Sequence, residues 1–180
     1  AACRLATSAA IILGGSGFSV MPRELLEMGR VEYGVVGEGE RNFPALLGAL
    51  AGGENAAGLP GVACLRRGEF RAPPRRDAYD VLEGNVRPAR NLIDSGRYRA
   101  TGAAAGVQTK RGCPFSCIYC TYPLVEGAAV RVRPASDVAD EFQDLHDRFG
   151  AKTAYIVDSQ FNYPADHARS VCEELVSRRD

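Results

Sequence analysis

The chain has 180 residues, and its 22 Lys and Arg are balanced by 22 Asp and Glu, so the formal net charge is zero. Hydrophobic residues make up 46% and charged residues 24%, which is typical of a globular protein. The charge balance gives no global signal for nucleic-acid binding, although a local patch stays open. No apolar run approaches the roughly 20 residues of a membrane-spanning helix, so no membrane span is predicted.

The six cysteines are too few for a disulfide scaffold, and half of them lie in "KRGCPFSCIYC", as Cys113, Cys117 and Cys120. The chain begins with Ala rather than Met, and we expect it to be an internal segment of a longer protein. Clustered cysteines without an export signal indicate metal or redox chemistry in a reducing compartment, so a cytoplasmic protein is expected.

The first part of the chain, residues 1–58, alternates strands and helices. Four elements are expected: a strand at 9–15, a helix at 21–29, a strand at 33–40 and a helix at 41–53. The last helix is expected to bury one face, made of Phe43, Leu46, Leu47 and Leu50. Glycines at the carboxyl ends of the strands predict a parallel sheet with ligand-facing loops.

The second part, residues 59–103, is expected to be a hairpin followed by a linker. The hairpin is predicted to turn at Arg67 and Gly68. This part of the chain contains five arginines, which form either a basic patch or an ordinary solvated surface. The solvated surface is favoured, because a run of charges usually faces solvent. The arginines are Arg66, Arg67, Arg71, Arg75 and Arg76.

The third part, residues 104–180, repeats the strand and helix alternation around the cysteines. Its expected elements are a strand to about Thr109, a loop with the cysteines, a helix at 134–150, a strand at 151–159 and a helix at 164–179. The first of these helices has an apolar stripe made of Val138, Phe142, Leu145 and Phe149.

Three thiolates at these spacings suit a metal centre. Iron–sulfur clusters take cysteine ligands, whereas a structural zinc site needs four ligands. The other cysteines near the motif, Cys64 and Cys172, are each about fifty residues away. Either a remote residue completes the set, or three ligands are the whole set and one iron stays open. A zinc site with a remote ligand and buried free thiols are the alternatives.

The pattern C-x3-C-x2-C within "RGCPFSCIYC", with Tyr119 before the last cysteine, resembles the radical S-adenosylmethionine superfamily. The resemblance implies a [4Fe–4S] cluster on Cys113, Cys117 and Cys120, with Tyr119 among the cofactor contacts. It also implies that the open iron chelates S-adenosylmethionine, which is cleaved reductively to a 5′-deoxyadenosyl radical. An external electron donor such as flavodoxin or ferredoxin is then expected.

Residues beside the cluster motif extend this resemblance. In the family, the end of the second barrel strand helps to hold the amino group of S-adenosylmethionine, often through Gly-Gly-Glu. Here "VDSQFN" lacks that glycine pair, and Asp158 and Asn162 are expected to serve as acceptors, with helix capping as the alternative. Lys110 and Arg111 are expected either to offset the negative charge of the cluster or to be solvated loop charges.

The first part of the chain resembles the second half of a cobalamin-binding Rossmann-like domain, through "IILGGSGFS", "YGVVGEGERNFPALLGAL" and "GLPGVA". The resemblance implies that the nucleotide tail of cobalamin is bordered by Gly14, Gly15, Gly37, Glu38 and Gly39. Glycine permits close approach of backbone to a ligand, although an ordinary tight turn is the alternative. The sequence contains no Asp-x-His-x-x-Gly motif, so cobalamin is implied by resemblance alone.

The resulting fold class is α/β: the C-terminal half of a Rossmann-like cobalamin-binding domain at 1–58, a hairpin and linker at 59–103, and the first strand–helix units of a partial TIM-type barrel at 104–180. The implied function is cobalamin-dependent methyl transfer to an unactivated carbon of a small-molecule substrate.

Two other functions stay open. "CIYCTYPLVEG" also resembles radical S-adenosylmethionine methylthiotransferases that modify RNA or protein, but these carry three further amino-terminal cysteines, and only Cys3 and Cys64 precede the motif. The other alternative is a non-catalytic structural metal module. His146 and His167 are expected on the surface, and Cys3, Cys64 and Cys172 are expected to be buried.

Overall fold

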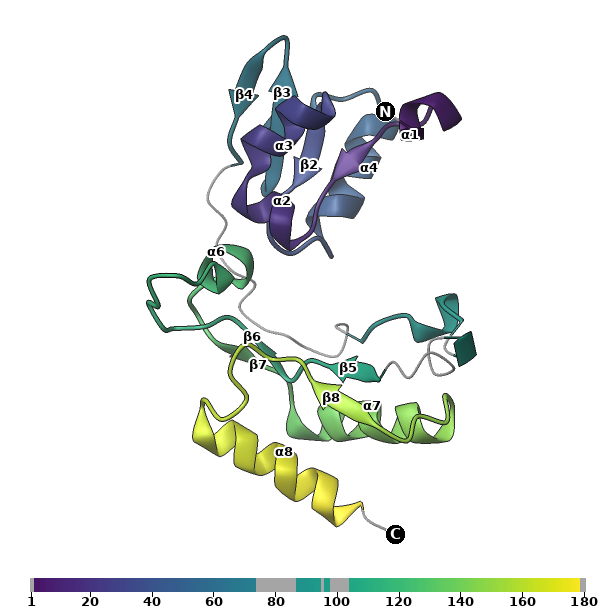
Figure 1. Ribbon diagram of the computed structural model, residues 1–180, viewed down its shortest axis with the longest axis vertical. Helices are drawn as coiled ribbons and strands as arrows, with labels where there is room; N and C mark the ends of the chain where they lie inside the picture. Colours follow the sequence, from purple (N-terminus) through teal and green to yellow (C-terminus); the bar gives the residue numbers. More distant parts are fainter. Residues whose placement is uncertain (1, 74–86, 95, 98–103, 179–180) are drawn as a thin grey trace. The chain divides into compact units, whose positions relative to one another are not determined.

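The computed structural model describes residues 2–73, 87–94, 96–97 and 104–178 (Figure 1). The chain divides into two compact units. The first consists of residues 1–78 together with 115–127, and the second of residues 79–114 together with 128–180. Arg75 and Arg76, which the sequence analysis singled out, lie outside the described residues. Within the described ranges, no helix has the length and apolar character of a membrane span.

The first unit contains a four-stranded sheet in the order β1-β2-β3-β4. Its strands are β1 (Ile12–Leu13), β2 (Tyr33–Val35), β3 (Val62–Arg66) and β4 (Glu69–Arg71). Its helices are α1 (Ala2–Ala6), α2 (Ser16–Val20), α3 (Pro22–Gly29), α4 (Asn42–Ala51), the 3₁₀ turn η1 (Ala56–Gly58) and α6 (Tyr122–Glu126). The expected strand and helix alternation of residues 9–53 is confirmed, with shorter strands than the sequence suggested.

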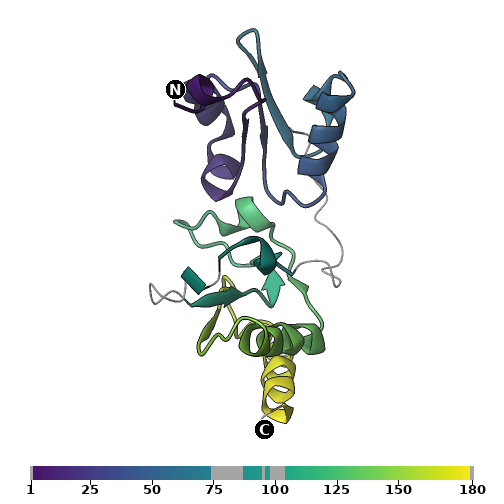
Figure 2. The same ribbon diagram turned by 90° about the vertical axis from the view of Figure 1, so that its right-hand side faces the viewer.

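Both faces of this sheet are covered. Successive residues of β3 point to opposite faces, so Val62 and Cys64 pack with Leu46 of α4, whereas Ala63 packs with Phe18 of α2 and Leu26 of α3. Figure 2 shows the two sets of helices on either side of the sheet. The apolar run "VAC" therefore forms a strand that is buried on both faces.

The hairpin at Arg67 and Gly68 is confirmed, and both residues have positive φ, 52° and 81°. This geometry is the one that closes a two-residue hairpin loop. The hairpin is not separate from the first part of the chain, however, because β3 pairs with β2 in antiparallel register, with Tyr33 opposite Cys64. β1 and β2 are parallel as predicted. The predicted parallel sheet concerned residues 1–58 alone, and the antiparallel pairing of β3 with β2 was not predicted, since a strand buried on both faces carries no pattern that fixes its direction.

Helix α4 presents a different face to the sheet from the one predicted. Its buried residues are Asn42, Leu46 and Ala49, spaced four and three apart. Phe43 and Leu47 are 43% and 45% exposed, so the predicted face is wrong at these two positions. The small Ala49 side chain belongs to the contact face instead, and Phe43 is turned toward the loops at the carboxyl ends of β1 and β2.

The second unit contains the predicted strands and helices in order, and it adds the short strands β6 (Lys110–Arg111) and β7 (Arg131–Val132) where the sequence analysis expected only a loop. β5 (Ala105–Val107) pairs in parallel with β8 (Ala154–Ile156), and β6 pairs with β7. Its helices are α7 (Ala135–Asp147) and α8 (Ala165–Ser177), with the 3₁₀ turn η2 (Arg90–Leu92). The predicted stripe of α7 is confirmed, because its four residues pack in one core with Val107 of β5 and Val171 of α8.

Replacing Gly34 of β2 by Ala is expected to lower the free energy of unfolding by about 1–3 kcal/mol. The added methyl group would meet the ring of Phe18, which is buried on that face. The matched control is Gly48→Ala in α4, where no heavy atom lies within 4 Å of the new methyl group. The control is expected to raise the free energy of unfolding by about 0.8–1 kcal/mol through helix propensity. Chemical denaturation followed by circular dichroism measures both, and equal effects would contradict the packing of Phe18 on β2.

Candidate functional site

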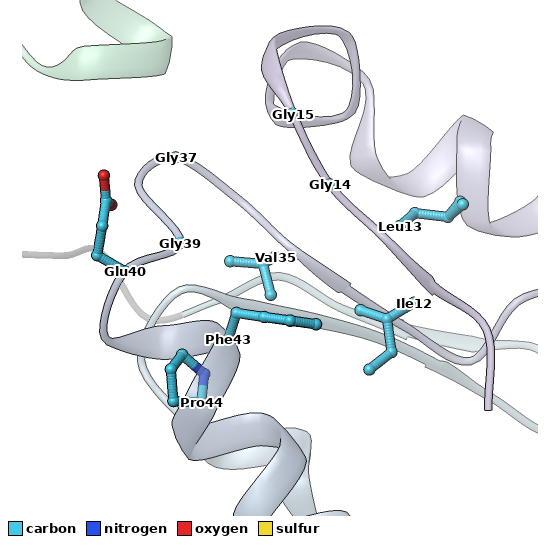
Figure 3. Close-up of a pocket in the computed structure, with 10 residues that line it drawn as sticks. All are labelled: Ile12, Leu13, Gly14, Gly15, Val35, Gly37, Gly39, Glu40, Phe43 and Pro44. Atoms are coloured by element: carbon cyan, nitrogen blue, oxygen red, sulfur yellow. The ribbon is translucent and has the colours of Figure 1, made fainter. Parts of the chain in front are cut away.

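Four of the predicted glycines line one pocket of about 520 Å³ in the first unit. Gly14 and Gly15 follow β1, and Gly37 and Gly39 follow β2, so the parallel pairing of these strands brings the two loops together. Figure 3 shows the two loops facing each other across the pocket. Glu38 belongs to the same loop but is not one of the lining residues.

The floor of this pocket is apolar. Ile12, Val35, Phe43 and Pro44 line it together with the bare glycine backbone, and Figure 3 shows Phe43 and Ile12 reaching toward each other below the loops. Glu40 adds a carboxylate to the lining. Apolar walls with exposed backbone suit a bulky ligand that is bound by contact and by peptide groups, and the pocket is not arranged as an acid–base site.

A serine that the sequence analysis missed ties the two glycine loops together. Ser19 Oγ donates to Gly15 O at 2.8 Å and accepts from Gly37 N at 2.8 Å, and the residue is buried. Gly15 and Gly37 have φ values of 89° and 74°, a region that favours glycine. The sequence signal was the position of Ser19 four residues after Gly15, where a helical hydroxyl bonds back to the preceding turn.

The three motif cysteines are all free thiols, with Cys113 buried, Cys120 half-buried and Cys117 exposed. Cys120 N donates to Cys117 O at 3.1 Å, which closes a turn between the last two. The boundary between the two units falls just before Phe115, within this loop. Across the described ranges, no three His, Cys, Asp or Glu side chains are grouped as a site that could hold a metal ion. The assignment of the three motif cysteines as metal ligands therefore remains a prediction.

The loop between the cysteines exposes apolar surface. Ile118 and Tyr119 are exposed at 105% and 87%, and Phe115 is 45% exposed. A bound ligand would cover this surface, which is consistent with the predicted cofactor contact of Tyr119. The chemistry of the donor set also fits: three unoxidised thiols in one continuous loop are the ligand type that an iron–sulfur cluster takes.

Asp158 is at the centre of a buried polar network in the second unit. Its Oδ1 accepts from the backbone N of Thr109 and of Lys110 at 2.7 and 3.4 Å. Its Oδ2 accepts from Thr109 Oγ1 at 2.5 Å and from Lys110 Nζ at 2.8 Å. The Asp158 side chain is 0% exposed and that of Lys110 is 2% exposed.

These contacts differ from the ones that the sequence suggested. Each oxygen of Asp158 already has two donors, so a direct contact with a ligand amino group, which stays a prediction, would require partners to exchange. Lys110 is paired with Asp158 and also donates to Phe161 O at 3.1 Å. Its charge is therefore directed to Asp158, and not to the solvent as a loop charge would be. Asn162 is exposed and its Oδ1 accepts from Gln160 Nε2.

The prediction of a surface histidine is confirmed for His146, whose side chain is 76% exposed, and is wrong for His167. His167 is half-buried, and its Nε2 lies 3.3 Å from Thr109 Oγ1. Burial, and then the positive charge of Lys110, hold the pKa of His167 below its usual range. Its place four residues before the buried Val171 was the signal that could have found it.

A second buried cluster holds the strand that leads to the cysteines. Arg90, Arg133 and Glu141 form this ion triad, with Arg90 Nη2 and Arg133 Nη1 each 2.7 Å from a different oxygen of Glu141. The same two nitrogens donate to Gly106 O and Gln108 O, both at 2.6 Å. The triad thus fixes the carbonyls of β5 and of the residue just after it.

The remaining cysteines differ from one another. Cys64 is buried as predicted, and burial raises the pKa of its thiol. Cys3 and Cys172 are exposed, so the prediction of burial is wrong for both. Cys172 follows the buried Val171 on α8 and so lies off the buried face of that helix.

The chain is similar in sequence to proteins described as methyltransferases. No model of a known protein family matches the chain. An uncharacterized methyltransferase of Pyrococcus horikoshii is 30% identical over 153 residues, which cover 84% of this chain and 33% of that protein. The tryptophan 2-C-methyltransferase of Streptomyces laurentii is 28% identical, with 98% of this chain and 37% of that enzyme covered. The chain therefore spans about a third of the length of these curated relatives.

Solved structures of one enzyme are also similar. The radical S-adenosylmethionine methyltransferase TsrM from Kitasatospora setae, with tryptophan substrate and an S-adenosylmethionine analogue bound, matches at a TM-score of 0.84 and 29% identity, over 98% of this chain and 34% of that chain. TsrM with cobalamin and a [4Fe-4S] cluster bound matches at a TM-score of 0.83 and 28% identity, over 98% of this chain and 35% of that chain. The likeness confirms the expected fold class, a Rossmann-like part followed by the first units of a partial barrel.

The buried position of His167 predicts a pH dependence of stability. The pKa of His167 is lower in the folded chain than its unfolded value of about 6.5. The unfolded chain therefore binds this proton more readily. The contribution of neutral His167 to the free energy of unfolding is fully present above about pH 6.5 and is lost as the pH falls through the folded pKa. His167→Gln is expected to reduce the fall in the free energy of unfolding between pH 7 and pH 5 relative to the wild type. Urea denaturation at a series of pH values measures this, and an identical pH dependence in the variant and the wild type would contradict it.

Proposed function

Because the chain is a relative of the cobalamin-dependent radical S-adenosylmethionine enzymes, we propose that it supplies cofactor-binding residues of an enzyme that transfers a methyl group to an unactivated carbon. The observation that carries this proposal is the match to TsrM over 98% of the chain at 29% identity. Structures of TsrM hold cobalamin, a [4Fe-4S] cluster and an S-adenosylmethionine analogue. The thiols and glycines of this chain suit those groups chemically.

Cys113, Cys117 and Cys120 are the proposed ligands of a [4Fe–4S] cluster. All three are free thiols within eight residues of one loop, and thiolate is the ligand that such clusters take. When bound, a cluster with one iron left open by the protein supplies the electron that cleaves S-adenosylmethionine. The role of this chain is to present three thiolates. Assembly of the cluster therefore releases protons, and the cluster assembles less readily at low pH.

Tyr119 and Asn162 are the proposed contacts to S-adenosylmethionine. Both are exposed and so are accessible to a ligand. The ring of Tyr119 offers a face for a planar group, and the amide oxygen of Asn162 is an acceptor for an ammonium group. Asp158 was expected in the same role, but its buried contacts support action through Thr109 and Lys110 instead.

The glycine pocket is the proposed site for part of a cobalamin. Gly14, Gly15, Gly37 and Gly39 leave backbone exposed along its rim, with Glu38 in the same loop. The absence of side chains at these glycines lets a bulky ligand approach the peptide groups. The apolar floor contributes contact area, which supports binding of a large, partly apolar group and not of a phosphate alone.

The proposed substrate is a small molecule. TsrM has been solved with a tryptophan substrate, and one relative is named as a tryptophan 2-C-methyltransferase, which supports a carbon acceptor. An external electron donor such as flavodoxin or ferredoxin is part of the proposal. The methylthiotransferase alternative gains no support from the relatives above, which are described as methyltransferases. The alternative of a non-catalytic metal module is likewise not favoured by relatives that are enzymes.

Replacing any one of Cys113, Cys117 and Cys120 by Ala is expected to abolish cluster assembly, because each removes one of only three protein ligands. The measurement is iron and sulfide content after anaerobic reconstitution of the full protein, with electron paramagnetic resonance with and without S-adenosylmethionine. Cys172→Ala is the matched control, since this thiol is exposed but lies outside the motif. Zinc uptake without iron, or a cluster whose signal ignores S-adenosylmethionine, would refute the proposed function.

Gly39→Leu is expected to weaken cobalamin binding by about tenfold or more, because a side chain there enters the rim of the pocket. The backbone at Gly39 has no positive φ, and a Cβ would meet only Phe43 at 3.9 Å, so the fold should accept the change. Gly48→Leu on α4 is the control outside the pocket. Absorbance titration with hydroxocobalamin measures affinity, and equal affinity in both variants would exclude this pocket.

A further inference from the structure

The chain from the second residue of β5 to the residue before the first motif cysteine is held along its length; we call these residues, 106–112, the lead-in segment. Its first carbonyls, those of Gly106 and Gln108, accept from the ion triad. Between them, Val107 O accepts from Val157 N at 3.0 Å. Thr109 O accepts from the backbone N of Arg133 at 2.9 Å. The lead-in segment is therefore fixed at successive residues before the chain reaches Cys113.

Residues just after β8 fix the second half of the lead-in segment. The Asp158 carboxylate binds the backbone N and the side chains of both Thr109 and Lys110. The next residue, Ser159, donates from Oγ to Gly112 O at 3.4 Å. Two consecutive residues after β8 thus hold the lead-in segment at its middle and at its last residue, which precedes Cys113.

Thr109 is the hub of this network, and the direction of its hydrogen bonds can be assigned. Its hydroxyl must donate to Asp158 Oδ2, because an ionised carboxylate is only an acceptor. The same oxygen therefore accepts from His167 Nε2, which places the proton of the neutral imidazole on Nε2. The side chain of Thr109 is fully buried, so neither bond competes with solvent.

We propose that Thr109 and Asp158 are positioning residues that set the conformation of the lead-in segment and thereby the place of Cys113, before any cluster is bound. His167 supports them by its bond to Thr109. This inference rests on the proposed function only for its consequence at the cluster. The hydrogen bonds themselves predict a rigid lead-in segment in the metal-free protein.

The test is hydrogen exchange of the full protein without metal, read on peptides that cover residues 109–114. Thr109→Val keeps the size and branching of the side chain but removes the hydroxyl. It is expected to speed amide exchange in these peptides by about tenfold, because a buried bond to a charged group is lost. Thr109→Ser keeps the hydroxyl and is expected to exchange at nearly the wild-type rate.

Two further variants make the result specific. Thr153→Val makes the same substitution at an exposed position before β8 and is expected to leave the exchange of residues 109–114 unchanged. Asp158→Asn removes the charge that faces Lys110, and its exchange is expected to rise at least as much as in Thr109→Val. If Asp158→Asn fails to fold, the threonine pair still decides the question.

The second readout is the reconstituted cluster. In Thr109→Val, the electron paramagnetic resonance signal and the reduction potential are expected to differ from wild type, and in Thr109→Ser to match it. Wild-type exchange in Thr109→Val, or equally fast exchange in Thr109→Val and Thr109→Ser, would overturn the positioning role. A wild-type protein that takes up no iron would overturn the proposed function instead, while the exchange rates would still decide the positioning role.

Discussion

The buried ion pair between Lys110 and Asp158 is the contact on which the second unit depends. Transfer of both charges out of water is costly, and their attraction offsets that cost only when further hydrogen bonds satisfy both groups. The structure meets this condition, because Thr109 and Phe161 supply the remaining partners. Removal of one charge would leave the other unpaired in the interior, which costs about 3–5 kcal/mol. The pair therefore joins the start of β6 to the segment that follows β8.

The sequence predicted features that depend on local patterns. The apolar stripe of α7, the hairpin turn at Arg67 and Gly68, and the gathering of the glycine loops all follow from spacing or from the pairing of parallel strands. The polar networks could not be predicted, because their members are distant in sequence. Lys110 and Asp158 are 48 positions apart, and Arg90 and Glu141 are 51 apart. Charge alone does not tell which acid meets which base.

In the first unit, the pairing of β3 was not predicted and the contact face of α4 was predicted wrongly, and both have one physical cause. Hydrophobicity reports burial but not orientation. β3 is buried on both faces, so its pattern is the same in either direction. On α4, the large apolar Phe43 was assigned to the core, whereas it lines the glycine pocket. An apolar side chain near a binding loop can either pack in the core or line the pocket, and helical periodicity does not distinguish the two.

The hydroxyl of Ser19 has a consequence for how related sequences can vary. It donates to one glycine loop and accepts from the other, so the position needs a short side chain that does both. Alanine does neither, and an ionised aspartate only accepts. Serine and threonine do both through a single hydroxyl oxygen, which is how Ser19 reaches the two loops. Homologues that keep the glycines but carry another residue here would have loops that are no longer tethered, so position 19 separates sequences with a fixed pocket from sequences with a loose one.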